Sequence, residues 1–299
     1  MIDPACPQCH EVLSRGPAGF ACTACGRGYA LRDGIPDFVT GARFEDAVPE
    51  GELAYEEDCC IDTTRRYWIP AFRRLLGERA RGARVLAVGC GVGTEIDELQ
   101  AAGFDSAGID SGNRASAWSR RASRDRLFLA NGERLPFRDD AFDVVFCGCL
   151  FPHVGDEADS HRPGPGYLDK RRALAAEMAR VLRPGGHILV ASANRRCPLD
   201  LFHGREPGSY RPRWNPPGDP FLLSEDDYRD LFARAGCAGL ALEPTEGFWT
   251  FNRSRRSLRG RLLALPVRLL FWLESRAFAR RLRGSPVSPW IVAHTSKPA

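Results

Sequence analysis

The chain has 299 residues, of which 43% are hydrophobic, and a formal net charge of +4. This length accommodates one α/β domain together with a small additional module. No run of eighteen or more apolar residues occurs, and the first residues lack the basic start and apolar core of a secretory signal, so we expect neither a membrane span nor secretion. Eleven cysteines in such a chain indicate a reducing compartment, and we expect a cytoplasmic protein.

Four cysteines near the N-terminus are spaced like metal ligands. Two C-x2-C pairs, Cys6 with Cys9 and Cys22 with Cys25, are separated by twelve residues. Each pair can form a tight turn that brings two thiolates to one ion, and four thiolates complete a closed, structural zinc site. A module this small buries too little apolar surface to fold alone, whereas bound zinc can supply the missing free energy. We therefore predict a zinc-ribbon module over residues 1–45, the alternative being four unpaired cysteines in an unstructured arm.

A linker and a helix are predicted to follow this module. Residues 41–54 are acidic and contain glycine and proline, which is the composition of a linker. From Tyr55 to Leu76, aromatic and apolar residues recur at helical spacing. Tyr67 and Trp68 on this helix either line a binding pocket or pack in the core, and packing is the simpler expectation.

A buried strand at 84–89 leads into a glycine-rich turn. Its glycines, Gly89, Gly91 and Gly93, form G-x-G-x-G rather than the G-x-G-x-x-G of dinucleotide sites, and no Walker-type G-K-[ST] follows. Backbone at such a turn can approach a ligand closely because no Cβ intervenes. The next apolar strand ends in Asp110, where a carboxylate can bind both ribose hydroxyls. The two features predict a nucleoside pocket at the carboxyl edge of a parallel sheet.

The rest of the sequence alternates short apolar strands with helical segments, which is the pattern of βαβ units and a parallel sheet. Strands are expected at 84–89, 105–110, 126–130, 142–147, 186–192, 238–243 and 290–295. Helices are expected at 93–103, 113–122 and 167–182, and from Ser224 to near Gly236. Ser224 is the predicted N-cap of the last helix, with acidic residues in its first turn.

Four motifs in order resemble the class I S-adenosylmethionine-dependent methyltransferases. The first is the strand with its G-x-G-x-G turn, and the others are Leu127 to Phe137, Asp140 to Phe146 and Met178 to Val190. They are similar to the family's third strand and loop, its fourth strand, and its helix, Pro-Gly-Gly turn and fifth strand. The resemblance covers residues 84–192. It implies a Rossmann-like, seven-stranded, mostly parallel sheet with helices on both faces, whose last strand is antiparallel between the fifth and sixth.

The same resemblance implies S-adenosyl-L-methionine as the cofactor. The residues that it assigns to the cofactor site are Gly89, Cys90, Gly91, Gly93, Asp110, Ser111, Asn131, Gly132 and Cys147. Asn131 stands where the family usually has an acid facing the adenine amino group, and its side-chain oxygen can still accept. Ala87 stands where many members have an acid in the first strand. Either Glu95 or a backbone carbonyl replaces that acid, or cofactor binding is weakened.

Two further resemblances concern the N-terminal module and the loop after the fourth strand. The segment from Tyr29 to Phe38 resembles Trm112-like zinc ribbons, some of which activate methyltransferases in trans; here the similar module is fused to a domain over residues 46–299. His153 follows the fourth strand, where the family's loop faces both cofactor and acceptor. Histidine titrates near neutrality, so His153 is the candidate catalytic base, with packing or cofactor contact as the alternatives.

Two segments, 194–221 and 253–283, are predicted insertions beside the substrate. The second contains ten arginines and one acid, Glu274, and its charge of +9 leaves −5 for the rest of the chain. Four of its arginines are spaced to share one helical face: Arg268, Arg276, Arg280 and Arg283. Four roles are open for such a basic amphipathic helix: it lies on an anionic membrane, covers an apolar substrate, contacts phosphates, or packs its apolar side on the domain.

The sequence thus predicts a methyltransferase that acts on a small-molecule or lipid-like acceptor by in-line transfer, with peripheral membrane contact through 253–283 as a further expectation. One alternative is methylation of guanine in ribosomal RNA, which the arginines favour and the acidic remainder of the chain disfavours. Another is a non-catalytic binding protein with a decayed pocket. The acceptor, the methylated atom and the oligomeric state do not follow from the sequence.

Overall fold

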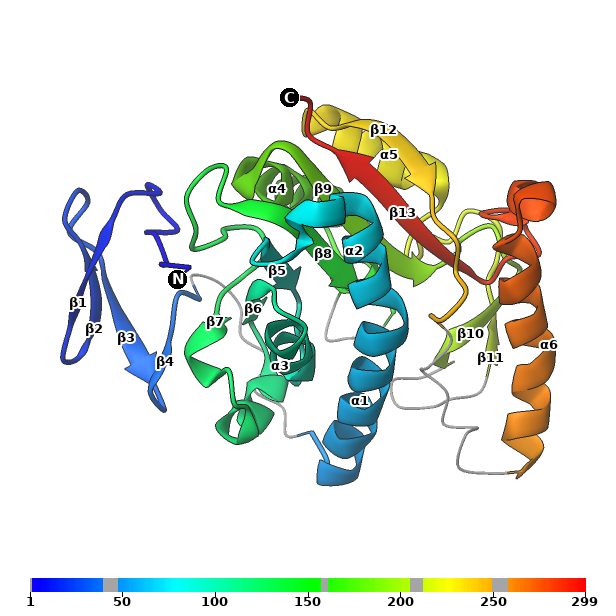
Figure 1. Cartoon of the computed structure of the whole chain (residues 1–299), viewed down its shortest axis with the longest axis horizontal. Helices are drawn as coiled ribbons and strands as arrows, with labels where there is room; N and C mark the ends of the chain where they lie inside the picture. Colours follow the sequence, from blue (N-terminus) through cyan, green and yellow to red (C-terminus); the bar gives the residue numbers. More distant parts are fainter. Residues whose placement is uncertain (1, 40–47, 157–160, 205–211, 249–257) are drawn as a thin grey trace. The chain divides into compact units, whose positions relative to one another are not determined.

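The computed structural model divides into two compact units, which are described separately (Figure 1). The first comprises residues 1–146, 173–188 and 297–299, and the second comprises residues 147–172 and 189–296. The structure describes residues 2–39, 48–156, 161–204, 212–248 and 258–299.

The N-terminal ribbon is a four-stranded antiparallel sheet in the first unit. Its strands, in sheet order, are β1 (Leu13–Gly16), β2 (Gly19–Cys22), β3 (Gly28–Arg32) and β4 (Ile35–Pro36). Gly19 has φ +144°, and a Cβ there would lie 2.1 Å from the carbonyl oxygen of Tyr29, so this close pairing of β2 with β3 requires glycine. The buried ring of Phe38 packs between Tyr29 and Phe20, with centroids 5.1 and 5.8 Å away.

The main sheet has seven strands in the order β12-β13-β9-β8-β5-β6-β7. Their bounds are β5 (Arg84–Val88), β6 (Asp105–Asp110), β7 (Leu127–Leu129), β8 (Phe142–Gly148), β9 (Leu182–Ala193), β12 (Ala238–Leu242) and β13 (Trp290–Ser296). β5 pairs in parallel with β6 and with β8, and β6 pairs in parallel with β7. β13 lies between β9 and β12 and is antiparallel to β12. The predicted mostly parallel, seven-stranded α/β sheet is confirmed, although β9 begins four residues before the expected strand.

One helical run precedes β5 in the first unit. It consists of α1 (Glu50–Thr63), a π-helical turn η1 (Thr64–Trp68) and α2 (Ile69–Leu76), followed by the 3₁₀ turn η2 (Gly77–Ala80). α1 begins inside the predicted linker, whose residues 41–47 lie outside the described residues. Tyr67 and Trp68 are buried, and Trp68 packs on Phe146 with ring centroids 4.9 Å apart. Packing therefore explains both aromatic residues.

Three helical segments lie between β5 and β7: α3 (Thr94–Ala101), η3 (Asn113–Arg120) and η4 (Arg124–Arg126). The helix predicted at 113–122 is present as η3, which is a 3₁₀ helix rather than an α-helix. The hydroxyl groups of Ser116 and Ser119 bond carbonyl oxygens three residues earlier. Short polar side chains of this kind compete with the i→i−4 pattern of an α-helix.

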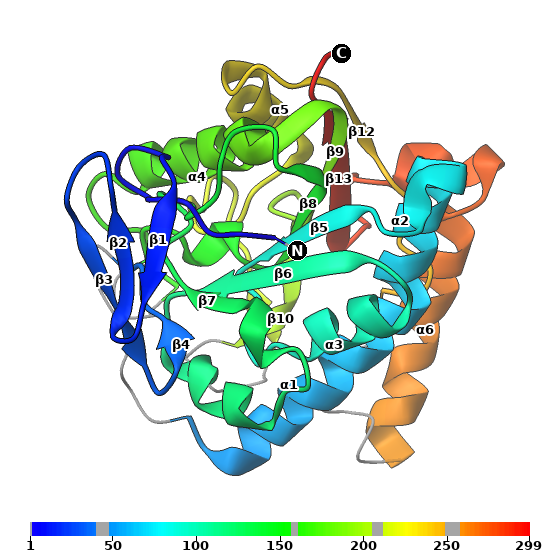
Figure 2. The ribbon, with the colours of Figure 1, turned by 60° about the vertical axis from the view of Figure 1, so that its left-hand side comes forward.

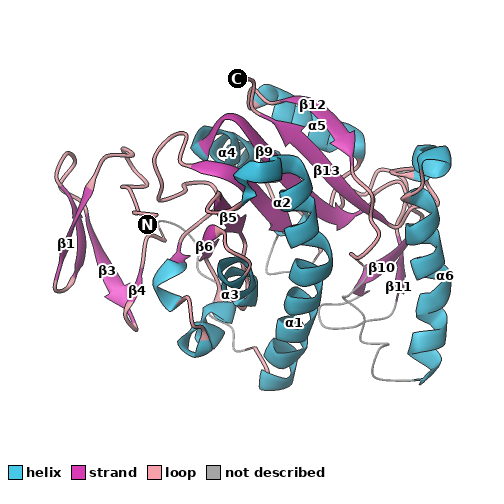
Figure 3. Cartoon of the chain, in the orientation of Figure 1, coloured by secondary structure: helices cyan, strands magenta, loops and turns pink. Residues whose placement is uncertain are grey.

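The second unit contains further helices and a two-stranded hairpin (Figure 3). Its elements include η5 (Phe151–His153), β10 (Leu199–Gly204), β11 (Pro212–Trp214), α5 (Glu225–Arg234), α6 (Leu258–Glu274) and η7 (Ala277–Leu282); α4 (Tyr167–Val181) begins in this unit. A capping box between Ser224 and Asp227 starts α5, as the sequence predicts. Among the described residues, no helix combines the length and the apolar character needed to cross a bilayer.

The predicted single arginine face across 253–283 is wrong. Residues 253–257 lie outside the described residues, and α6 ends at Glu274, so only Arg268 of the four arginines belongs to that helix. The guanidinium group of Arg276 pairs with Glu246 at 2.9 Å, and that of Arg283 donates to three backbone carbonyls. The Ser275 hydroxyl bonds the carbonyl oxygen of Phe271 at 2.7 Å at the end of the helix.

Candidate functional site

The glycine-rich turn between β5 and α3 has the backbone that its sequence predicts. Gly89, Gly91 and Gly93 all have left-handed φ values, of +74°, +50° and +76°. A Cβ on Gly93 would lie 3.0 Å from Leu127 Cδ1 and 3.2 Å from the ring of Trp118. Because both the backbone angle and the space favour glycine, the turn keeps a bare backbone at the end of β5.

Asp110, at the end of β6, is bonded to this turn. Its Oδ2 accepts the Gly91 N–H at 2.9 Å, and its Oδ1 accepts the Gly112 N–H at 2.9 Å. Each oxygen keeps acceptor capacity, so both can still receive a hydroxyl group. Burial raises the pKa of Asp110, while the two N–H groups oppose that shift by stabilising the carboxylate.

Trp118 is a residue of this region that the sequence did not single out. Its indole Nε1–H donates to the Gly91 carbonyl at 2.8 Å, and its side chain is fully buried. The turn is therefore held from Asp110 and from η3. An indole is a donor-only group that needs one partner when buried, but no spacing in the sequence pairs residues 91 and 118.

Cys90 is part of the turn only through its backbone. The N–H groups of Gly89 and Cys90 both donate to the Ile109 carbonyl at 2.9 Å. The Cys90 thiol is buried, and it lies 2.8 Å from the place of a Cβ on Gly108. Burial, followed by the charge of Asp110, raises the pKa of this thiol well above its usual range. Its side chain therefore behaves as a small apolar group.

Asn131 follows β7 beside the same edge. The Ala130 N–H donates to the Asp110 carbonyl at 2.9 Å, which links the end of β7 to the end of β6. Asn131 Oδ1 is buried and has no hydrogen-bond partner among the residues that the structure describes. A buried acceptor without a partner costs free energy, so this oxygen is suited to a donor from a ligand, such as an amino group.

The other predicted cofactor residues have ordinary structural surroundings. Gly132 leaves little space, because a Cβ there would lie 2.8 Å from Leu174 Cδ1, and Ser111 is half-buried next to Asp110. Cys147 is buried in β8, at the start of the second unit. Their contacts with a cofactor remain predictions.

Ala87 and Glu95 show where an acid is missing and where one is available. Ala87 is buried in β5 and pairs with Gly108 of β6. Glu95 lies in the first turn of α3, and burial, followed by the charge of Asp110, raises its pKa to about 8. The free protein therefore holds Glu95 largely protonated at neutral pH. A cation placed nearby would favour its ionised form.

Acidic side chains of α1 hold the η3 segment through arginines. Glu56 accepts two bonds from Arg114, from Nε at 2.7 Å and from Nη2 at 2.8 Å. Glu57 pairs with Arg120 and with Arg121, each at 2.7 Å. Exposed pairs add little stability, but a forked guanidinium contact fixes orientation. These arginines were not predicted, because their partners lie 58 to 64 positions away.

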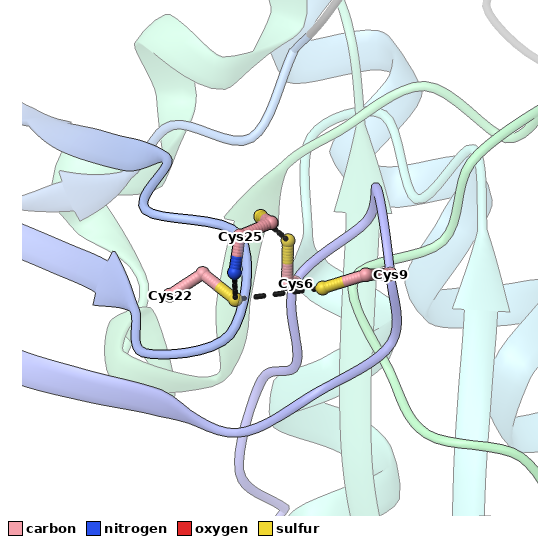
Figure 4. Close-up of side chains that lie close together, drawn as sticks. All are labelled: Cys6, Cys9, Cys22 and Cys25. Carbon is pink, nitrogen blue, oxygen red and sulfur yellow. Dashed lines mark hydrogen bonds between the residues drawn. The ribbon is translucent and has the colours of Figure 1, made fainter.

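The four cysteines of the N-terminal module come together as predicted (Figure 4). The sulfur of Cys9 lies 3.5 Å from that of Cys22, and the sulfur of Cys6 lies 3.6 Å from that of Cys25. Zinc–sulfur bonds of about 2.3 Å in a tetrahedron place sulfurs about 3.8 Å apart, so the cluster fits one zinc ion. Burial raises the pKa of Cys6, but the Tyr29 hydroxyl and backbone N–H groups outweigh it and lower that pKa to about 6.

The ribbon is bonded to the loop that carries Asn131. The Phe38 N–H donates to the Leu129 carbonyl at 2.7 Å, and the Ala5 N–H donates to the Pro136 carbonyl at 2.8 Å. Figure 2 shows β4 beside β7, and the two elements are in contact. The ribbon therefore holds the Asn131 loop at both of its ends.

His153 lies in the second unit, within a group of histidines. Its ring centroid is 5.2 Å from that of His203 and 5.9 Å from that of His161. The side chain of Cys149 also lies within reach of His203, at 3.5 Å from Sγ to Nε2. The catalytic role of His153 remains a prediction, whereas its grouping with these residues was not expected.

Comparisons with known proteins match the part of the chain that contains the glycine-rich turn. A family model described as a methyltransferase domain matches residues 86–190. Two curated relatives are demethylmenaquinone methyltransferases. The one from Renibacterium salmoninarum is 31% identical over 54% of this chain and 61% of its own length. The one from Beutenbergia cavernae is 30% identical over 58% of this chain and 67% of its own length.

A similar solved structure is phosphoethanolamine N-methyltransferase 2 from Haemonchus contortus, with 18% identity, a TM-score of 0.44, and coverage of 78% of this chain and 52% of that chain. The chain spans about six tenths to two thirds of the two curated relatives that it matches. On the strength of these curated relatives, the chain belongs to the S-adenosylmethionine-dependent methyltransferase family.

Proposed function

We propose that this protein binds S-adenosyl-L-methionine in its first unit and transfers the methyl group to a small-molecule acceptor. The observation that carries the proposal is the shared edge of β5, β6 and β7. There a bare glycine turn, the carboxylate of Asp110 and the buried oxygen of Asn131 lie together. These groups match the needs of a nucleoside, namely close backbone, acceptors for two ribose hydroxyls and an acceptor for an amino group.

The residues present fit the cofactor, and each has a separate task. Asp110 holds the ribose, Asn131 accepts from the adenine amino group, and Glu95 in its ionised form accepts from the ammonium group at the other end. When bound, the sulfonium supplies an activated methyl group. The protein then needs chiefly to orient the acceptor, and orientation can supply about 7–11 kcal/mol of the barrier. His153 remains our candidate base for an acceptor that loses a proton.

We propose an apolar, lipid-like acceptor taken from or near a membrane surface of the cytoplasm. The two relatives are named for demethylmenaquinone, which supports a small-molecule acceptor. Large apolar side chains are exposed on α6 and η7: Leu262, Leu265, Leu269, Trp272 and Phe278. Arg268 on α6 and Arg280 on η7 are exposed as well, and exposed apolar groups beside such arginines are suited to an anionic bilayer surface. Methylation of RNA is less well supported, since Arg276 and Arg283 are engaged within the protein.

The proposal also includes zinc in the four-cysteine cluster. The donor set and the sulfur spacing fit a closed structural site. Zinc there would stabilise the ribbon and, through the Leu129 and Pro136 carbonyls, the loop of Asn131.

The role of Asp110 can be tested by calorimetry. In Asp110→Ala, we expect the affinity for S-adenosylhomocysteine to fall at least about 10- to 150-fold, which corresponds to the loss of one hydrogen bond to a charged group at about 1.5–3 kcal/mol. The control is Asp125→Ala, which removes an exposed carboxylate and should bind normally. Unchanged affinity in Asp110→Ala would refute the cofactor site. Transfer of a labelled methyl group to reduced quinones tests the activity itself.

Glu95 should give the protein a characteristic pH dependence. Its folded-state pKa of about 8 lies above the ordinary 4.5, so the folded protein binds the extra proton and stability falls as pH rises from about 4.5 to about 8. Glu95→Gln should remove this loss and raise the free energy of unfolding at pH 8 by on the order of 1–4 kcal/mol, with a smaller gain at pH 5. Urea unfolding at both values checks this, and an equal effect at both contradicts it.

Loss of the ribbon metal should weaken cofactor binding. We expect Cys22→Ser to lose one zinc per chain and to bind S-adenosylhomocysteine several-fold more weakly, because the Asn131 loop loses its anchors. Cys197→Ser, a substitution of a buried cysteine outside the cluster, should change neither value. Normal cofactor affinity in a Cys22→Ser protein that has lost the ribbon zinc would show that the ribbon does not support the loop.

Contact with a membrane can be tested with vesicles that contain phosphatidylglycerol. We expect the protein to co-sediment with them, and the double variant Leu269→Glu/Trp272→Glu to lose most of this binding, because both exposed apolar contacts become charged. Val287→Glu changes an exposed residue outside α6 and should leave binding intact. If the double variant binds like the wild type, α6 is not the contact.

A further inference from the structure

We propose that Cys149, His153 and His203 of the second unit form a second metal site, which takes a divalent transition-metal ion such as zinc. While an ion is bound, His153 is a metal ligand and not the base considered above, so the two roles of His153 are alternatives. Each residue offers one ligand atom, and the three atoms all lie within 4.8 Å of one another. The set is separate from the four cysteines of the ribbon, which belong to the first unit.

The measured spacing agrees with two bonds to one ion. Cys149 Sγ and His203 Nε2 are 3.5 Å apart. Zinc bonds of about 2.3 Å to sulfur and about 2.0–2.1 Å to nitrogen, at a tetrahedral angle, give a separation of about 3.5 Å. A thiol–imidazole hydrogen bond would give a similar distance for this pair. The second imidazole, from His153, within the same reach is what favours an ion.

The carboxylate of Asp200 orients His203 for metal binding. His203 Nδ1 lies 2.9 Å from Asp200 Oδ2, and the Asp200 side chain is completely buried. The same carboxylate accepts from Arg213 Nε at 3.2 Å and from the backbone N–H groups of Phe202 and His203. A carboxylate on Nδ1 fixes the proton there and leaves the lone pair of Nε2 facing Cys149. Metal-bound histidines usually have such a partner on the second ring nitrogen.

The backbone at Cys149 is unusual for a residue with a side chain. It has φ +57° directly after β8, and its N–H donates to the Ala191 carbonyl at 2.7 Å. Non-glycine residues seldom adopt this left-handed conformation, and where they do, the strain often serves a functional site. The cysteine is therefore held at this point of the chain at some cost.

The surroundings indicate which ion the site would select. One thiolate and two imidazoles favour zinc and similar transition metals over magnesium or calcium, which prefer oxygen ligands. The ring of Phe221 packs on His203 and His153, with centroids 5.0 and 5.4 Å away, and so provides an apolar wall. Three protein ligands leave a fourth position for water or another oxygen ligand, as in zinc sites with exchangeable ligands.

Metal content of the tag-free, full-length protein tests the proposal. By mass spectrometry of the metals, we expect two zinc ions per chain in the wild type, one in Cys149→Ser, one in His203→Gln and one in Cys22→Ser. The matched control, Cys197→Ser, should keep two. The circular dichroism spectrum of each variant shows whether it is folded. Of the substitutions at the second site, Cys149→Ser changes the shape of the side chain least.

A second measurement detects the site if its metal ion binds weakly or is lost during purification. The folded Cys22→Ser protein, stripped with a chelator, is titrated with Co²⁺ and followed by visible absorption. We expect one equivalent to give the intense bands of four-coordinate cobalt with a thiolate ligand, and these bands should be absent when Cys149→Ser is added to the same protein. One zinc in the wild type, together with no cobalt bands in folded Cys22→Ser, would overturn the proposal. Neither readout depends on cofactor binding, so failure here is distinct from failure of the proposed function.

Discussion

The two backbone N–H bonds to the Asp110 carboxylate are the constraint on which the proposed cofactor site depends. One comes from Gly91 in the turn and the other from Gly112 in the next loop, each at 2.9 Å. They draw a left-handed glycine backbone to the end of β6, and the indole of Trp118 holds the same turn from the other direction. Because both oxygens are fixed before any ligand arrives, little ordering is left to oppose binding.

The ribbon supplies backbone hydrogen-bond partners at the edge of the main sheet formed by β7. β7 is the last strand of the main sheet and has only three residues, and such an edge strand would leave backbone groups unpaired. Phe38 and Ala5 bond the carbonyls of Leu129 and Pro136 instead. A module whose own stability would come from a metal cluster is thereby joined to the loop of Asn131. In this arrangement, folding of the ribbon and order in the loop are energetically coupled.

The sequence predicted most of the sheet and the ribbon because their signals are local. Apolar strands buried on both faces are continuous in sequence, and C-x2-C pairs place their ligands within one turn. Contacts between distant segments carried no such signal. The prediction of a single arginine face was wrong because α6 ends at Glu274. The buried Glu274 carboxylate accepts a hydrogen bond from the Thr245 hydroxyl, and no local sequence pattern indicates this contact. Cys149 and His203 are 54 positions apart, and the hairpin that carries His203 lies in an insertion without periodicity.

The replacement of the usual acid by Ala87 is best understood through the charges around it. Ala87 lies on β5, where it pairs with Gly108 two residues before Asp110, and a buried carboxylate there would add a charge to a site that already raises the pKa of Glu95 to about 8. Glu95 instead lies in the first turn of α3, where the helix dipole favours negative charge. In the proposed site, Glu95 on the helix would replace an acid on the strand, with its proton held until a cation arrives. A protonated Glu95 adds no second negative charge beside Asp110 in the free protein, and ionisation of Glu95 would then be part of ligand binding rather than of folding.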